Sequence, residues 1–273
     1  MKSNYRYIVK AFMAMAVIAG TTSCDDFLDR EPMSSISPET YYSTAAQLEA
    51  NLNDEYPNVL PSFGQWTYGI FGEDKGTDNQ IEVNANDRYT QDRWKVPHSE
   101  SDNWKFERIY RINFFLSEAL PKFGEDMSGS QNTISGSVAT IKHYIGEMYF
   151  LRAYEYFKKL QLFGDFPIIN QPLADEMEAL REASKRFPRN EVARFIISDL
   201  DKAYAYMSDV DMATTRINKD VAMLVKSRVA LFEATWLQNF KGTAFVPGGE
   251  GWPGASLHNN YQYPSGNIDN EVK

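Results

Sequence analysis

Apolar residues recur every three or four positions in the second part of the chain, which is the spacing of a buried helix face. The longest such pattern covers 138–163, and Gly164 and Pro167 directly after it are residues that end helices. A second pattern begins near residue 102 and stops near Pro121 and Gly124. Both patterns exceed 15 residues, so they predict two substantial helices.

Polar residues that cap helices mark three further beginnings. Thr44-x-x-Gln47 has the spacing of a capping box and predicts a helix that is closed by Pro57 and Pro61. Asn190 and Asn218 each stand before an apolar periodic stretch, so each is predicted to be an N-cap. No β-rich segment of comparable strength occurs, and the predicted fold class is therefore all-α.

The four later helices are expected to pair as two helical hairpins with long irregular loops. Small residues, Ala153, Ala222 and Ala230, stand where helices would approach closely, which favours tetratricopeptide-like stacking. A plain helical bundle is the alternative. Residues 61–101 lack periodicity and are rich in Gly, Asn, Asp and aromatics, which predicts a long functional loop.

The first 23 residues read as a cleavable secretory signal. Lys2, Arg6 and Lys10 precede an apolar run that is too short to span a bilayer. Small residues then lead into Cys24, in the pattern of a bacterial lipobox, so Cys24 is predicted to carry the lipid. An ordinary signal peptide with an incidental cysteine is the alternative. Residues 24–38 are expected to form the tether, and 39–273 the helical domain.

Composition excludes several other classes. The net charge is −9, and loss of the three cations of the signal changes it to −12, so nucleic acid is not an expected partner. One Cys and three His exclude a disulfide framework and most zinc sites. We expect no cofactor and no metal, although the Asp- and Asn-rich stretch 72–92 leaves calcium open.

Several motifs together resemble one family, the SusD/RagB-type lipoproteins. The resemblance extends over residues 24–240 and includes Trp104-x5-Tyr110-x-Ile112-Asn113. The other stretches that carry it are Cys24-Asp25-Asp26-Phe27-Leu28-Asp29 with Pro32 and Ser37-Pro38-Glu39, Arg152-Ala153-Tyr154-Glu155-Tyr156-Phe157, Phe163-Gly164-Asp165-Phe166-Pro167, Phe195-Ile196-Ile197-Ser198-Asp199-Leu200 and Ile217-x3-Val221-Ala222-x2-Leu224-x3-Arg228-Val229-Ala230-Leu231.

The resemblance implies a surface-exposed, lipid-anchored outer-membrane protein. Family members bind oligosaccharides, or in some cases peptides, and deliver them to a TonB-dependent transporter of the SusC type. They are about twice as long as this chain, so the resemblance also implies an N-terminal portion that is truncated at the C-terminus.

A glycan site needs aromatic faces together with polar groups that bond hydroxyls. The loop 61–104 offers both, and aromatics in a polar loop are less often core residues than Tyr149, Tyr156 and Phe157 on the long helix. The candidate ligand-binding residues are Trp66, Tyr68, Asp78, Arg88 and Trp94.

No catalytic motif is present, so the chain is not expected to be an enzyme; a surface hydrolase is the weakest alternative. Gly249, Gly251 and Gly254 match G-x-G-x-x-G, but no βαβ unit can follow, so we interpret this stretch as a loop with Trp252, Tyr261 and Tyr263 as surface aromatics. A second hypothesis from another class is a helical-repeat scaffold that acts only through protein–protein contacts.

Overall fold

The computed structural model describes residues 41–61, 80, 103–124, 126–208, 212 and 215–273. Within these ranges the chain forms helices and no strand, so the predicted all-α class is confirmed. Isolated bridges join Thr44 to Ser135 and Phe166 to Phe187. The α-helices are α3 (Ala45–Val59), α4 (Glu107–Phe123), α5 (Val138–Phe163), α6 (Met177–Ala183), α7 (Arg189–Tyr206), α8 (Lys219–Asn239) and α9 (Ile268–Glu271).

Local signals at the helix ends act as the sequence predicts in three places. The Thr44 side chain accepts a hydrogen bond from the backbone N–H of Gln47, and the Gln47 side chain accepts one from the backbone N–H of Thr44, which completes the capping box of α3. Asn218 caps α8 through the amide of Val221. Gly164, with φ of 67°, ends α5 at the predicted position.

Other boundaries differ from the prediction. Asn190 is not an N-cap: the N-cap of α7 is Pro188, two residues earlier, and Asn190 lies inside the helix. Its side chain bonds the Tyr261 hydroxyl instead, a contact 71 residues away that no local pattern reveals. Pro57 does not end α3 but lies inside it; the helix continues to Val59 and ends before Pro61, the second predicted stop. The short helices α6 and α9 were not predicted at all.

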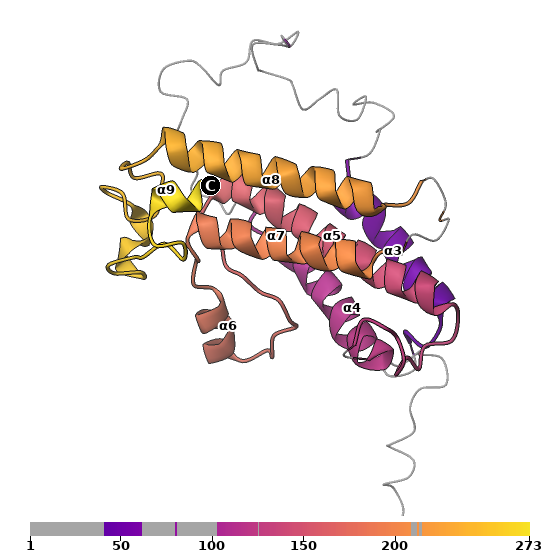
Figure 1. Ribbon diagram of the computed structural model, residues 1–273. Helices are drawn as coiled ribbons and strands as arrows, with labels where there is room; N and C mark the ends of the chain where they lie inside the picture. Colours follow the sequence, from indigo (N-terminus) through magenta and orange to yellow (C-terminus); the bar gives the residue numbers. More distant parts are fainter. Residues whose placement is uncertain (1–40, 62–79, 81–102, 125, 209–211, 213–214) are drawn as a thin grey trace, which may run out of the picture. The chain divides into compact units, whose positions relative to one another are not determined.

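The long helix α5 is the centre of the fold. It packs against α3, α4, α7 and α8, while α7 and α8 lie side by side (Figure 1). Tyr149, Tyr156 and Phe157 on α5 are buried, which confirms them as core residues. Because α5 is covered on several sides, its apolar residues do not form a single stripe, and seventeen of its residues are buried.

One glycine allows α5 and α7 to meet closely. A Cβ added at Gly146 would lie 2.8 Å from the amide nitrogen of Met207 and 2.9 Å from the carbonyl oxygen of Ala203. Both contacts are with backbone atoms, which cannot move aside as a side chain can. Any larger residue at position 146 would therefore push the C-terminal turn of α7 away from α5.

A buried ion pair joins the same two helices. The Arg152 guanidinium, on a residue 3% exposed, donates from Nε to Asp199 Oδ2 at 2.6 Å and from Nη2 to Asp199 Oδ1 at 2.9 Å. Its Nη1 donates to Asn113 Oδ1 of α4 at 2.9 Å. One side chain of α5 thus fixes the positions of α4 and α7 together.

None of the helices in the described ranges is both long and apolar enough to cross a membrane.

Replacement of Asp199 by Asn is expected to lower the free energy of unfolding by about 3–5 kcal/mol, because it leaves the Arg152 charge buried without a counter-ion. Urea unfolding followed by circular dichroism measures this. Asp201→Asn, on the same helix, is the matched control: Asp201 is exposed and pairs with Lys226 at the surface, so the change should be below about 1 kcal/mol. Equal losses in the two variants would contradict the role given to the buried pair.

Candidate functional site

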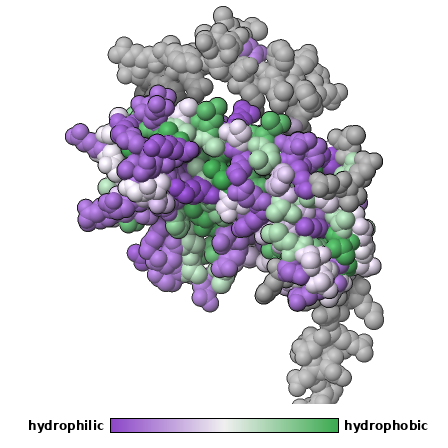
Figure 2. Space-filling model, in the orientation of Figure 1, coloured by the Kyte–Doolittle hydropathy of each residue, from purple (hydrophilic) through white to green (hydrophobic). Residues whose placement is uncertain are grey.

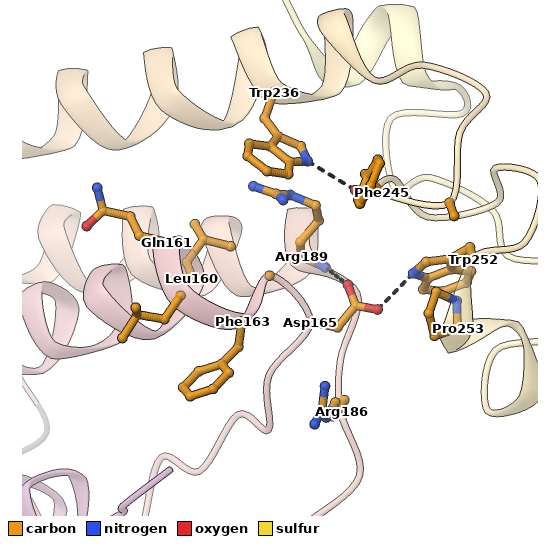
Figure 3. A pocket seen from close by; sticks show the side chains of 13 residues that line it. Leu160, Gln161, Phe163, Asp165, Arg186, Arg189, Trp236, Phe245, Trp252 and Pro253 are labelled. Atoms are coloured by element: carbon orange, nitrogen blue, oxygen red, sulfur yellow. Dashed lines mark hydrogen bonds between the residues drawn. The ribbon is translucent and has the colours of Figure 1, made fainter. Parts of the chain in front are cut away.

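A cavity of about 300 Å³ lies where α5 ends, α7 begins and α8 ends (Figure 3). We call it the Asp165 cavity. The segment after α8 closes one side of it, so four parts of the chain that are distant in sequence contribute to its wall. The lining residues are Leu160, Gln161, Leu162, Phe163, Gly164, Asp165, Arg186, Arg189, Trp236, Ala244, Phe245, Trp252 and Pro253.

Asp165 is held in this cavity by two donors. Its Oδ1 accepts from the backbone amide of Arg189 at 2.9 Å, and its Oδ2 accepts from Trp252 Nε1 at 2.8 Å. Burial raises the pKa of the Asp165 carboxyl above its usual value, and the two hydrogen bonds oppose that shift. The carboxylate therefore links the end of α5, the first turn of α7 and the C-terminal segment.

Arg189 lies between Trp236 and Asp165 (Figure 3). Its guanidinium carbon is 4.0 Å from the centroid of the Trp236 ring, within cation–π distance. Behind it, Nε and Nη2 donate to the buried Glu233 carboxylate at 2.9–3.1 Å. Burial raises the pKa of Glu233, and the Arg189 hydrogen bond lowers it. This pairing fixes the plane of the guanidinium.

Two cations keep donors available to a ligand. Arg189 Nη1 makes no hydrogen bond with the described residues, and a Cβ at Gly164 would lie 3.5 Å from it, so the glycine leaves space beside this donor. The Arg186 guanidinium rests on the Trp104 ring, 4.6 Å from its centroid. Phe245, 61% exposed, adds an aromatic face. The cavity thus combines hydrogen-bond donors, a carboxylate and aromatic rings.

The C-terminal segment that closes the cavity is tied to α7. Glu271 accepts from Arg194 Nη2 at 2.8 Å and from Asn190 Nδ2 at 3.2 Å. Burial would raise the pKa of Glu271, but the hydrogen bonds from Arg194, Ser265 and Asn190 outweigh it and hold the value at about 2. The wall of the cavity after residue 240 therefore depends on an ionised Glu271.

The site residues expected from sequence are not in the part of the chain that the structure describes. Cys24 lies outside the described residues, as do Trp66, Tyr68, Asp78, Arg88 and Trp94. Within the described residues, no group of three His, Cys, Asp or Glu side chains could hold a metal ion.

The prediction for Trp252 is wrong. Trp252 was expected at the surface, but it is 5% exposed because its indole donates to Asp165, 87 residues away in the chain. The glycines around it form turns: Gly248 and Gly251 have φ of 73° and 74°, and a short 3-10 helix, Pro253–Ser256, follows.

Sequence reasoning also missed Arg189, Arg186 and Trp236 as site residues. Each of the three has a partner at least 44 positions away in the chain, namely Glu233 for Arg189, Trp104 for Arg186 and Arg189 for Trp236, so no local pattern marks them. The only sequence signal near the site was the stretch Phe163-Gly164-Asp165-Phe166-Pro167. It includes Asp165, but it was noted for its resemblance to the SusD/RagB family and not as a candidate binding site.

A sequence profile of the SusD-like family, described as "Starch-binding associating with outer membrane", matches residues 26–231, which is most of the chain. The chain belongs to the SusD-like family. The matched range includes Asp165, Arg186 and Arg189, whereas Trp236, Phe245 and Trp252 lie beyond it.

Two relatives from Formosa agariphila are SusD-like protein P2, 25% identical over 253 residues, and SusD-like protein P25, 25% identical over 233 residues. The alignments cover 88% and 78% of this chain but 46% and 41% of the relatives, so the chain spans less than half their length.

Solved SusD-like structures give similar coverage. A SusD-like protein of Bacteroides fragilis has a TM-score of 0.48 and 17% identity, and the match covers 78% of this chain and 40% of that protein. A SusD-like carbohydrate binding protein of Bacteroides vulgatus has a TM-score of 0.48 and 16% identity, and the match covers 71% of this chain and 43% of that protein.

Arg194→Met is expected to reduce the acid sensitivity of the fold. The pKa of Glu271 is about 2 in the folded chain and near 4.5 when unperturbed, so its contribution to stability is present above pH 4.5 and is lost as the pH falls toward 2. Without Arg194 the folded pKa moves up, and less stability is lost between pH 4.5 and 3. Urea unfolding at pH 7, 4.5 and 3 measures this.

The matched control is Lys241→Met, because Lys241 pairs with Asp269 of the same segment at the surface. Its pH dependence should equal that of the unmodified chain. An Arg194→Met chain that loses as much stability on acidification as the control would show that this pair does not secure the segment.

Proposed function

We propose that the protein is a non-catalytic, lipid-anchored, outer-membrane protein that binds oligosaccharides and passes them to a SusC-type TonB-dependent transporter. In this proposal residues 1–23 are the signal, Cys24 carries the lipid, 24–38 form the tether and 39–273 form the SusD-like helical domain. Family membership and the family's description as starch-binding and outer-membrane-associated support it.

The observation that carries the binding proposal is the chemistry of the Asp165 cavity. Pyranose rings have apolar faces that pack on aromatic rings and hydroxyls that need both donors and acceptors. Phe245 and Trp236 supply the aromatic rings. Arg189 Nη1 supplies a donor, and the Asp165 carboxylate supplies an acceptor. Two guanidinium groups face two carboxylates, Asp165 and Glu233, so the cavity favours a neutral ligand.

The same contacts support a non-catalytic role. A glycosidase needs one carboxylic acid and one carboxylate that are free to act on the glycosidic bond. In the Asp165 cavity, Asp165 accepts from Arg189 and Trp252, and Glu233 is paired with Arg189. Both carboxylates are therefore engaged in holding the wall of the cavity.

The alternative is a helical-repeat scaffold that acts only through protein–protein contacts. Leu224 and Leu231, seven residues apart on α8, are 71% and 66% exposed, and Val221 and Met223 are exposed beside them. Figure 2 shows apolar surface among polar side chains on the side where α8 lies. An exposed apolar stripe of this kind favours a protein contact.

Phe245→Ala is expected to weaken oligosaccharide binding by roughly three- to tenfold, because it removes one aromatic face from the cavity. Isothermal titration of the full chain against a panel of neutral oligosaccharides measures this. The control is Tyr204→Ala, which removes another exposed aromatic, on α7 and outside the cavity, and should leave the affinity unchanged. Failure of the unmodified chain to bind any glycan, with transporter capture retained, would favour the scaffold.

Cys24→Ser is expected to move the protein from the membrane fraction to the soluble fraction of the cell, because one thioether-linked lipid would provide the anchor. Metabolic labelling with a radioactive fatty acid should mark the unmodified chain and leave the variant unmarked. Equal labelling of both would contradict lipidation at Cys24.

A further inference from the structure

A second cavity, of about 370 Å³, lies along α5 and shares no lining residue with the first. We call it the Tyr149 cavity. Residues of α4, α5, α7 and the connection after α5 line it, and its apolar wall includes Leu116 and Leu120. Its volume is at the lower end of the range of small-molecule sites.

The charged groups of this cavity carry a net positive charge. Arg152 and Lys202 are its charged lining residues, and the carboxylate beside them is Asp199. Asp199 is fully buried and already bonded to Arg152 by two hydrogen bonds, while Lys202 Nζ lies 3.6 Å from Asp199 Oδ1. Two cations against one carboxylate leave one positive charge that Asp199 does not balance.

The hydroxyl of a largely buried tyrosine opens into the same cavity. Tyr149 is 7% exposed, and its ring stacks on Tyr206 with centroids 5.6 Å apart. The Arg152 guanidinium carbon and Lys202 Nζ both lie 5.3 Å from the Tyr149 centroid. The hydroxyl makes no hydrogen bond with any residue that the structure describes. Burial raises the pKa of Tyr149 to about 12, so the hydroxyl is a donor at neutral pH.

Because this hydroxyl is reached from the cavity, its hydrogen bond is left to water or to a ligand. The amide of Gln171, exposed at the edge of the cavity, also makes no hydrogen bond with the described residues. A ligand that supplies an anionic acceptor would satisfy the Tyr149 donor and the charge of Lys202 at once. A neutral hydroxyl would satisfy only the first.

We propose that the Tyr149 cavity binds a small carboxylate ligand, with Lys202 as its counter-ion and the Tyr149 hydroxyl as its hydrogen-bond donor. A uronic acid and a small amino-acid derivative both present this group. Arg152 does not contact the ligand as a free cation; it is a positioning residue that fixes the floor through Asp199. The inference is independent of glycan binding at the Asp165 cavity.

The test is isothermal titration of the full chain with D-galacturonate, N-acetylglycine and D-galactose. Galacturonate should bind at least about tenfold more tightly than galactose, which has the same ring without the carboxylate, because hydrogen bonds to charged groups are the stronger ones. Higher salt should weaken galacturonate binding. N-acetylglycine separates the two sources of the carboxylate. If it binds as tightly as galacturonate, the site accepts any small carboxylate; if it binds more weakly, the site prefers a sugar acid. Both results support the site.

Variants assign the binding to this cavity. Lys202→Met should weaken galacturonate binding about tenfold, and Tyr149→Phe, which keeps the stacked ring, about three- to tenfold. The matched control is Lys185→Met, which removes the same charge from an exposed lysine outside the cavity. Unchanged melting temperatures show that the variants are folded.

Galactose binding as tight as galacturonate, or equal affinities in Lys202→Met and Lys185→Met, would overturn the proposal. So would the absence of any carboxylate binding to the unmodified chain. Phe245→Ala alters only the Asp165 cavity and should leave galacturonate affinity unchanged, so failure of one site is distinguishable from failure of the other.

Discussion

The ion pair between Arg152 and Asp199 is the contact on which the rest of the structure depends. It joins α5 to α7 in the interior, where a charge without a partner is strongly unfavourable, and Arg152 also reaches Asn113 of α4. Gly146 permits the two backbones to approach on the same seam. Because α5 and α7 are held in this register, Gly164 at the end of one helix lies beside Arg189 at the beginning of the other, and the Asp165 cavity forms between them.

The two cavities differ in how their charges are compensated. In the Asp165 cavity each guanidinium charge is matched by a carboxylate, and aromatic rings make up much of the remaining wall. In the Tyr149 cavity Asp199 is paired with Arg152, so the positive charge of Lys202 is not balanced by a second carboxylate among the lining residues. A neutral ligand suits the first and an anionic ligand suits the second. One helix, α5, lines both, so the same packing supports two chemically distinct surfaces of a SusD-like chain.

The helices could largely be predicted from sequence because the signals that define them are local. The boundaries of α5 follow from its periodicity and from Gly164, and the cap of α8 follows from Asn218. The sites could not be predicted in this way. In the sequence Trp252 resembles a loop aromatic, but in the structure its indole is bonded to Asp165. Asn190 resembles an N-cap, but its side chain is bonded to Tyr261. In both cases the environment is set by residues 70 to 90 positions away, and hydrophobic periodicity contains no information about such pairs.

The central claim, that the Asp165 cavity receives the oligosaccharide, can be tested with the indole N–H signals of the five tryptophans in a ¹⁵N–¹H correlation spectrum of the full chain. Single Trp→Phe variants assign each signal. The Trp236 indole donates to the carbonyl oxygen of Phe245 and the Trp252 indole to the Asp165 carboxylate, both at the cavity wall, so we expect a neutral oligosaccharide to shift these two signals in a saturable manner. Saturable shifts confined to the other three tryptophans, with Trp236 and Trp252 unchanged, would contradict it.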